Sequence, residues 1–122
     1  MRTEVDRMTI VTELTRRNVR LNVGRRSKGS YQLGYLDPGG DFLPLYPGRS
    51  DTDCRRRLLN HADQAIYTHF RFFQTRTVKG AFIRECRDFH LLLSRGIDNV
   101  IHPRRPRNLP YNCPFCKEVD SL

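Results

Sequence analysis

The feature that most constrains this chain is a set of cysteine and histidine residues near its end. Cys86 and His90 lie four positions apart, and after 22 further residues Cys113 and Cys116 form a CxxC motif. The pattern Cys86-x3-His90-x22-Cys113-x2-Cys116 supplies four ligands in two closely spaced pairs, as tetrahedral zinc sites do. On a helix, residues four apart project from the same surface. We therefore predict one structural zinc, bound by these four residues, that ties the end of the chain to a helix.

The ligand set has open alternatives. Cys86 falls on an apolar helical stripe, so it is also interpretable as a buried core residue with His90 at the polar edge. Cys54, His61 or His102 would then complete the site. A chain of 122 residues buries only about two thirds of its unfolded surface. A structural zinc, which contributes on the order of 10 kcal/mol to folding, would therefore matter to its stability.

The same CxxC motif admits a redox interpretation. Cys113-Pro-Phe-Cys116 is similar to the redox motif of glutaredoxin-type proteins, a resemblance that covers these four residues. Redox motifs lie at the N-terminus of a helix that follows a strand, because the helix end lowers the thiol pKa. The proline-rich stretch before Cys113 does not predict such a strand. We favour metal binding.

The charge of the chain points to a polyanionic partner. The sequence has 22 basic and 13 acidic residues, a net charge of +9 and a pI near 10.0, and 19 of the basic residues are arginine. The guanidinium fork of arginine binds phosphate bidentately and stacks on bases, although a GC-rich coding sequence would give the same bias. The net charge itself favours binding to nucleic acid, and we expect RNA or single strands.

Three basic clusters are the candidate phosphate contacts. One of them, residues 55–57, falls in the first turn of a predicted helix, where positive charge opposes the helix dipole. A bound phosphate would offset this effect, whereas the alternative is a solvated helix start neutralised by Asp51 and Asp53. The predicted nucleic-acid contacts are Arg25, Arg26, Lys28, Arg55, Arg56, Arg57, Arg104, Arg105 and Arg107.

A second functional class remains open. Helical spacing places Arg84, Arg87 and Arg95 on the outer face of the second predicted helix, together with Leu91. A leucine among arginines predicts a docking surface, although single exposed leucines are common. The alternative function is therefore a zinc-stabilised adaptor that binds an acidic protein partner.

The first half of the chain alternates as strands do. Residues 19–23 and 31–35 place apolar side chains at every second position, and the basic connection 24–29 between them is bracketed by glycines. This pattern predicts a β-hairpin with an arginine-rich tip. We expect an earlier strand over residues 8–14, a turn at 37–40 and a short strand over 42–45.

From Asp51 the apolar period becomes helical. A first helix is predicted to carry an apolar stripe from Leu58 to Phe73, and a second runs over residues 77–95 and stops at Gly96. The expected fold is a single α+β domain. It comprises a small hairpin-rich antiparallel β-sheet (1–49), a two-helix hairpin (50–96) and a basic, proline-rich tail (97–122) that zinc pins to the body.

Localisation and activity follow from what the sequence lacks. No apolar run is long enough to cross a bilayer, and the polar start has no signal-peptide core, so we expect an intracellular protein, cytoplasmic, nuclear or both. Motifs for phosphate loops, nucleophile elbows and zinc proteases are absent, which predicts a non-enzymatic protein. Small basic proteins with one Cys/His zinc site occur among viral accessory factors, including suppressors of RNA silencing. A viral accessory role is one expectation, but no stretch matches such a family residue by residue.

Overall fold

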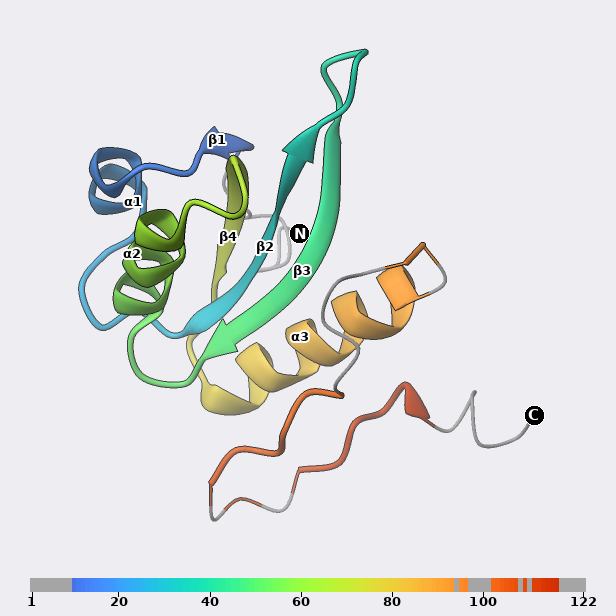
Figure 1. Ribbon diagram of the computed structural model, residues 1–122. Helices are drawn as coiled ribbons and strands as arrows, with labels where there is room; N and C mark the ends of the chain where they lie inside the picture. Colours follow the sequence, from blue (N-terminus) through green and yellow to red (C-terminus); the bar gives the residue numbers. More distant parts are fainter. Residues whose placement is uncertain (1–9, 94, 97–101, 108, 110, 117–122) are drawn as a thin grey trace, which may run out of the picture.

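The computed structural model describes residues 10–93, 95–96, 102–107, 109 and 111–116 (Figure 1). Within these residues the fold is α+β, as predicted, with a four-stranded antiparallel sheet and three helices. The order along the chain is β1 (Thr12–Glu13), α1 (Arg16–Asn22), β2 (Gly29–Leu36), β3 (Phe42–Ser50), α2 (Cys54–Gln64), β4 (His69–Gln74) and α3 (Val78–Leu93). In space the strands are ordered β1-β4-β2-β3.

The segment around Val19 is a helix, where the sequence predicted a strand. The side chain of Thr15 caps α1 by accepting a hydrogen bond from a backbone N–H in its first turn. Val19 and Val23 are buried while Leu21 is 71% exposed, which is the spacing of a helix face. The predicted first hairpin is therefore wrong, because its basic connection joins a helix to strand β2. A helix of seven residues is too short to distinguish the two periods by pattern alone.

The predicted strand at residues 31–35 is confirmed within β2, and its partner β3 is longer than expected. The predicted turn is also present, since the Asp37 N–H donates to the carbonyl of Asp41 at 2.8 Å. The strand β3 then continues through Pro44 and Pro47, where the sequence suggested a break. Proline is tolerated there because β3 forms an edge of the sheet, where one side of the strand has no ladder to join.

The first predicted helix is cut short and followed by a strand. Asp53 caps α2, and Ala65 ends it in a left-handed conformation with φ 55°. Phe70 and Phe73, expected on the helical stripe, lie instead in β4, where aromatic residues fit the pleated surface. No glycine follows the last turn of the helix, so no local signal predicted its end there. The predicted two-helix hairpin is wrong, because β4 separates α2 from α3 and pairs with both β1 and β2.

The second predicted helix is confirmed as α3. Phe82, Cys86 and Phe89 are buried on it. Gly96, with φ 75°, follows its end. Across the described segments, none of the helices combines the length and the apolar character that a membrane span requires.

The helices cover opposite faces of the sheet (Figure 1). Alternation along β2 sends Tyr31 and Leu33 into the apolar core shared with α1 and α2. Gln32, on the opposite face of the same strand, interacts with Asp88 of α3. The tail segment 102–107 lies on the side of α3 away from α1 and α2 (Figure 1).

Candidate metal centre and arginine cleft

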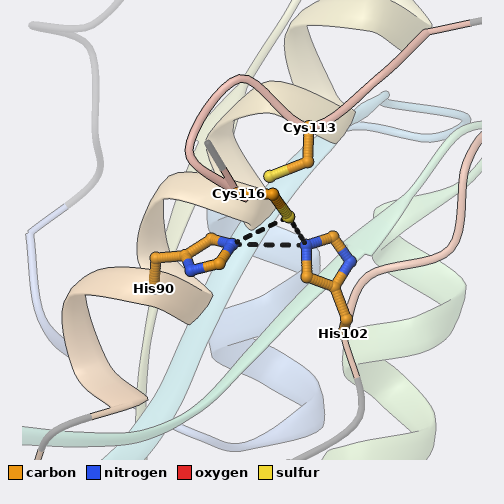
Figure 2. Close-up of side chains that lie close together, drawn as sticks. All are labelled: His90, His102, Cys113 and Cys116. Carbon is orange, nitrogen blue, oxygen red and sulfur yellow. Dashed lines mark hydrogen bonds between the residues drawn. The ribbon is translucent and has the colours of Figure 1, made fainter. Parts of the chain in front are cut away.

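Two histidines and two cysteines converge beside the C-terminal half of α3 (Figure 2). His90 comes from α3, whereas His102, Cys113 and Cys116 come from the tail. One donor atom from each lies within 4.8 Å of the others. The two Nε2 atoms of the histidines are 3.3 Å apart. Cys116 Sγ lies 3.5 Å from His90 Nε2 and 3.1 Å from His102 Nε2.

These separations resemble the edges of a small coordination tetrahedron. Zinc bonds of about 2.1 Å to nitrogen and about 2.3 Å to sulfur, at tetrahedral angles, place two nitrogens about 3.4 Å apart and nitrogen and sulfur about 3.6 Å apart. The observed nitrogen–nitrogen distance of 3.3 Å and the nitrogen–sulfur distances of 3.1 and 3.5 Å are close to these values. These four side chains therefore form a group that can hold a metal ion, and we call it the metal group.

The path of the tail explains how three of the donors reach α3. Pro103 and Pro106 are buried, so the tail packs against the body at these two positions. The tail returns after Tyr111, whose ring lies 5.6 Å from the ammonium of Lys79 near the start of α3. The tail arginines between these points remain exposed. They are Arg104, Arg105 and Arg107.

His102 stands where Cys86 was expected. The group contains His90, Cys113 and Cys116 from the predicted ligand set, and His102 was one of the alternatives that the sequence left open. Cys86 is fully buried and its side chain is hydrogen-bonded to Cys113. Burial raises the pKa of the Cys86 thiol, and the hydrogen bond to Cys113 adds to this rise. Cys86 is therefore a neutral thiol that contacts the candidate ligand Cys113 and is not itself a member of the group.

The other two alternative ligands lie elsewhere. The thiol of Cys54 donates to the carbonyl of Gly29 at 3.2 Å, and burial raises its pKa to about 12. His61 Nε2 lies 3.2 Å from the hydroxyl of Tyr31, and burial lowers the pKa of this histidine. Both belong to α2, on the opposite side of the sheet from the metal group. Neither contributes to that group.

A second feature is a cleft of about 420 Å³ between α1, the connection that follows it and the start of α2. Three segments that are separate in the sequence supply its walls, and five of the lining side chains are arginines. We call this feature the arginine cleft. Its lining residues are Arg16, Arg25, Arg26, Asp53, Arg55, Arg56, Leu59 and Asn60.

The arginine cleft has an excess of positive charge. Arg16 pairs with Asp63 at 2.6 Å, and Arg55 donates to the carbonyl oxygen of Arg20 at 2.9 Å. For the other three arginines, no carboxylate partner occurs within the described residues. The single carboxylate among the lining residues, Asp53, accepts a hydrogen bond from the Arg56 backbone N–H as the helix cap.

The cleft unites four of the nine predicted nucleic-acid contacts and adds one. Arg16 was not predicted, because the sequence pattern assigned its neighbourhood to strands. Arg57 and Lys28 do not line the cleft. The tail segment that carries Arg104, Arg105 and Arg107 lies beyond α3, on the other side of the sheet from α1 and α2 (Figure 1). The structure thus divides the basic residues between two surfaces.

The predicted outer face of α3 needs one correction. Arg84 is only 8% exposed, and its guanidinium carbon lies 3.9 Å from the centroid of the Phe73 ring, against the sheet. Arg87 and Arg95 are exposed, and Leu91 is 51% exposed. Arg84 was misplaced because α3 is covered by the sheet on one side and by the tail on another. The buried part of the α3 surface is therefore wider than one apolar stripe and includes Arg84.

No protein-family model, curated protein or solved structure matches this chain. The residues of the metal group and of the arginine cleft are therefore the basis for assigning a function.

Proposed function

We propose that this protein is a non-enzymatic nucleic-acid-binding protein that contacts RNA or single strands through arginine and is stabilised by one structural zinc. The observation that carries the nucleic-acid part is the arginine cleft. Arg25 and Arg26 converge there with Arg55 and Arg56, although some thirty residues separate the two pairs in the sequence. Like charges repel, so their convergence beside few carboxylates is expected where a polyanion binds.

The choice of zinc follows from the donor set. Two imidazoles and two thiolates suit zinc, which favours tetrahedral coordination by nitrogen and sulfur. Four protein ligands leave no position for substrate or water, which is the property of structural rather than catalytic sites. The role of the metal in this proposal is to hold the tail against α3.

Salt dependence of binding tests the nucleic-acid part. Titration of labelled single-stranded RNA at several salt concentrations should give an affinity that falls steeply with ionic strength. Replacing Arg55 and Arg56 with glutamine should weaken binding and reduce the salt slope by about one unit for each lost phosphate contact. The matched control is Arg104→Gln with Arg105→Gln, which also removes two charges but leaves the cleft intact. Equal losses in both variants, or none in either, would remove the cleft from the proposal.

Metal analysis of three variants tests the zinc part. Wild type should carry about one zinc per chain, and His102→Ala should lose it. Cys86→Ala should keep a full equivalent with roughly ten-fold weaker affinity, because this thiol supports Cys113 from behind. Cys54→Ala is the cysteine control and should keep the metal. Loss of zinc from Cys86→Ala with retention in His102→Ala would restore the ligand set that the sequence predicted.

One observation favours the adaptor as the second candidate. Leu91 and Leu93 are 51% and 43% exposed on α3, beside the exposed Arg87. An acidic protein partner with an apolar contact would fit that surface. Binding to such a partner should depend much less on salt than binding to RNA does. The salt titration therefore also separates the two candidates.

A further inference from the structure

We propose that the arginine cleft is a receptor for a terminal phosphate, either a phosphomonoester or a polyphosphate, rather than for phosphodiesters along a strand. This inference rests on the proposed nucleic-acid function and deepens it by naming the chemical group that the cleft takes. Its basis is the geometry of five arginines around one cavity.

The arginine cleft concentrates positive charge at one place on the surface. A phosphodiester carries a single negative charge, and successive diesters along a strand lie apart from one another. A terminal phosphate carries a charge of about −1.5 to −2 at neutral pH, and a polyphosphate carries more. Arginines from α1, α2 and the connection after α1 line one cleft instead of forming a line over the surface. Convergent guanidinium groups match a compact, highly charged ligand, because each can donate to a different oxygen of the same group.

The size and the lining of the cleft also fit a terminal phosphate and the group that carries it. At about 420 Å³ it falls within the range of roughly 300–1,000 Å³ that is typical of small-ligand sites. It is therefore large enough for more than one phosphate group. Leu59 offers an apolar wall and Asn60 a side chain that can both donate and accept hydrogen bonds. These two residues can contact the sugar or base that carries the phosphate.

Two features of the arginine cleft oppose the stability of the ligand-free protein. Arg26 has φ 57°, in the left-handed region that costs non-glycine residues about 1 kcal/mol. Arg55 and Arg56 lie in the first turn of α2, where positive charge opposes the helix dipole. Both features oppose stability in the ligand-free protein, and a bound anion offsets the second. Strain and unfavourable charge of this kind concentrate at ligand sites.

The test compares RNA ends on the zinc-loaded protein. A single-stranded RNA of one sequence is prepared with hydroxyl groups at both ends, with a 5′-monophosphate, with a 5′-triphosphate and with a 3′-phosphate, and labelled on an internal base. At least one phosphorylated form should bind roughly ten-fold or more tightly than the form with two hydroxyl ends, because charge-assisted hydrogen bonds form to a terminal group. Inorganic tripolyphosphate should compete with that form.

Matched variants locate the effect. Arg25→Gln with Arg56→Gln should remove the preference for phosphorylated ends, while metal content and circular dichroism stay those of wild type. Arg104→Gln with Arg105→Gln, which removes two charges from the tail, should weaken all four RNAs equally and keep the preference.

Each other outcome has a defined meaning. Equal affinity of wild type for all four RNAs, without binding of tripolyphosphate at the cleft, would overturn this inference while leaving the proposed function intact. If tripolyphosphate binds at the cleft but no RNA end is preferred, the phosphate chemistry stands and the source is a free polyphosphate instead of a nucleic-acid end. If neither RNA nor tripolyphosphate binds, both this inference and the proposed function fail.

Discussion

The two faces of the sheet are packed in different ways. Beneath α1 and α2 the buried side chains are apolar, and Leu33, Leu58 and Phe70 are fully excluded from solvent. Beneath α3 the buried residues combine apolar side chains, among them Phe73 and Phe82, with charged ones. Arg49 donates to Glu85 at 2.9 Å and to Asp51 at 2.6 Å. Arg84 and Asp88 of α3 are likewise buried, at 8% and 2% exposure.

This difference indicates that the two halves of the molecule are stabilised by different means. Burial of apolar area contributes about 25 cal/mol per Å² whatever the detailed geometry. A buried ion pair contributes little net free energy, because desolvation offsets most of the attraction. The buried charges of the α3 side should therefore stabilise it less than the apolar contacts around them do. On the proposed function, a zinc ion bound by the metal group would add a further link, because the group joins α3 to the tail and has no member on α1 or α2.

Metal removal should have the largest effect and should act on one side. Zinc binding to sites of this kind is worth on the order of 10 kcal/mol, so chelation should release the tail and increase hydrogen exchange along α3. Amides of α1 and α2 should keep their protection, because their core contains no ligand. Hydrogen exchange read by mass spectrometry measures this. Cooperative loss of protection on both faces would show that the two halves do not differ in this way.

Breaking the ion pair should cost several kcal/mol and should be reversible by a second change. Arg49→Met leaves Glu85 buried without its partner, at an expected cost of about 3–5 kcal/mol in the free energy of unfolding. Adding Glu85→Leu should recover most of that loss, because an apolar pair replaces an ionic one. On the opposite face Leu58→Ala should cost about 2–5 kcal/mol by creating a cavity. Denaturant unfolding measures all three. Failure of the double variant to recover would mean that the ion pair itself stabilises α3.

The pH dependence of stability should separate the two faces by a smaller amount. Burial raises the pKa of Glu85 from 4.5 to about 7, although Arg49 opposes the rise. The folded protein therefore holds this proton more tightly than the unfolded chain. The resulting stabilisation is complete below pH 4.5 and is lost as the pH rises through about 7. Glu85→Gln cannot ionise, so its stability relative to wild type should improve by up to about 3 kcal/mol across that interval.

The comparison is made at each pH between metal-loaded wild type and Glu85→Gln, so that effects on the metal ligands cancel. A stability difference that does not change with pH, or that changes in the opposite direction, would show that Glu85 remains ionised below α3.

Leu91→Asp should have the smallest effect. Leu91 is 51% exposed, so a charge at this position should change the free energy of unfolding by no more than about 0.5 kcal/mol. Its neighbour Leu92 is 2% exposed, and Leu92→Asp should be strongly destabilising because it buries an unpaired charge. Thermal unfolding of the two variants measures the contrast. A large loss in Leu91→Asp would mean that a segment of the chain covers this side of α3.

The elements that the sequence predicted well are those with local signals. The helix α3 has a long apolar period, and the turn between β2 and β3 has aspartate and two glycines. The elements it missed have signals that conflict. Residues 19–23 alternate like a strand, but they bury Val19 and Val23 and expose Leu21 as a helix does. The aromatic run of β4 continued the helical spacing of α2 by coincidence, and pairing with β1 and β2 decided the conformation.

The metal group and the arginine cleft were likewise predicted only where local signals exist. The CxxC pair and His90 were visible as a metal pattern, because a helix and a tight turn fix short spacings. His102 lies on an extended segment, eleven residues before Cys113, and no local period relates the two. Its position depends on where the tail packs against α3. The arginine cleft could not be predicted as one site from the sequence. The segment of α1 was predicted as a strand, so nothing placed Arg16 near α2.

The sequence by itself determined the α+β class, the donor types of the metal group and the excess of positive charge, because these depend on composition and on short-range spacing. The tertiary structure alone decided which face of the sheet each helix covers, that His102 joins the metal group, and that arginines from three segments share one cleft. The physical reason is range. Helical period, capping and ligand spacing act over a few residues, whereas strand pairing and side-chain convergence join residues tens of positions apart. Those contacts are fixed only when the whole chain packs.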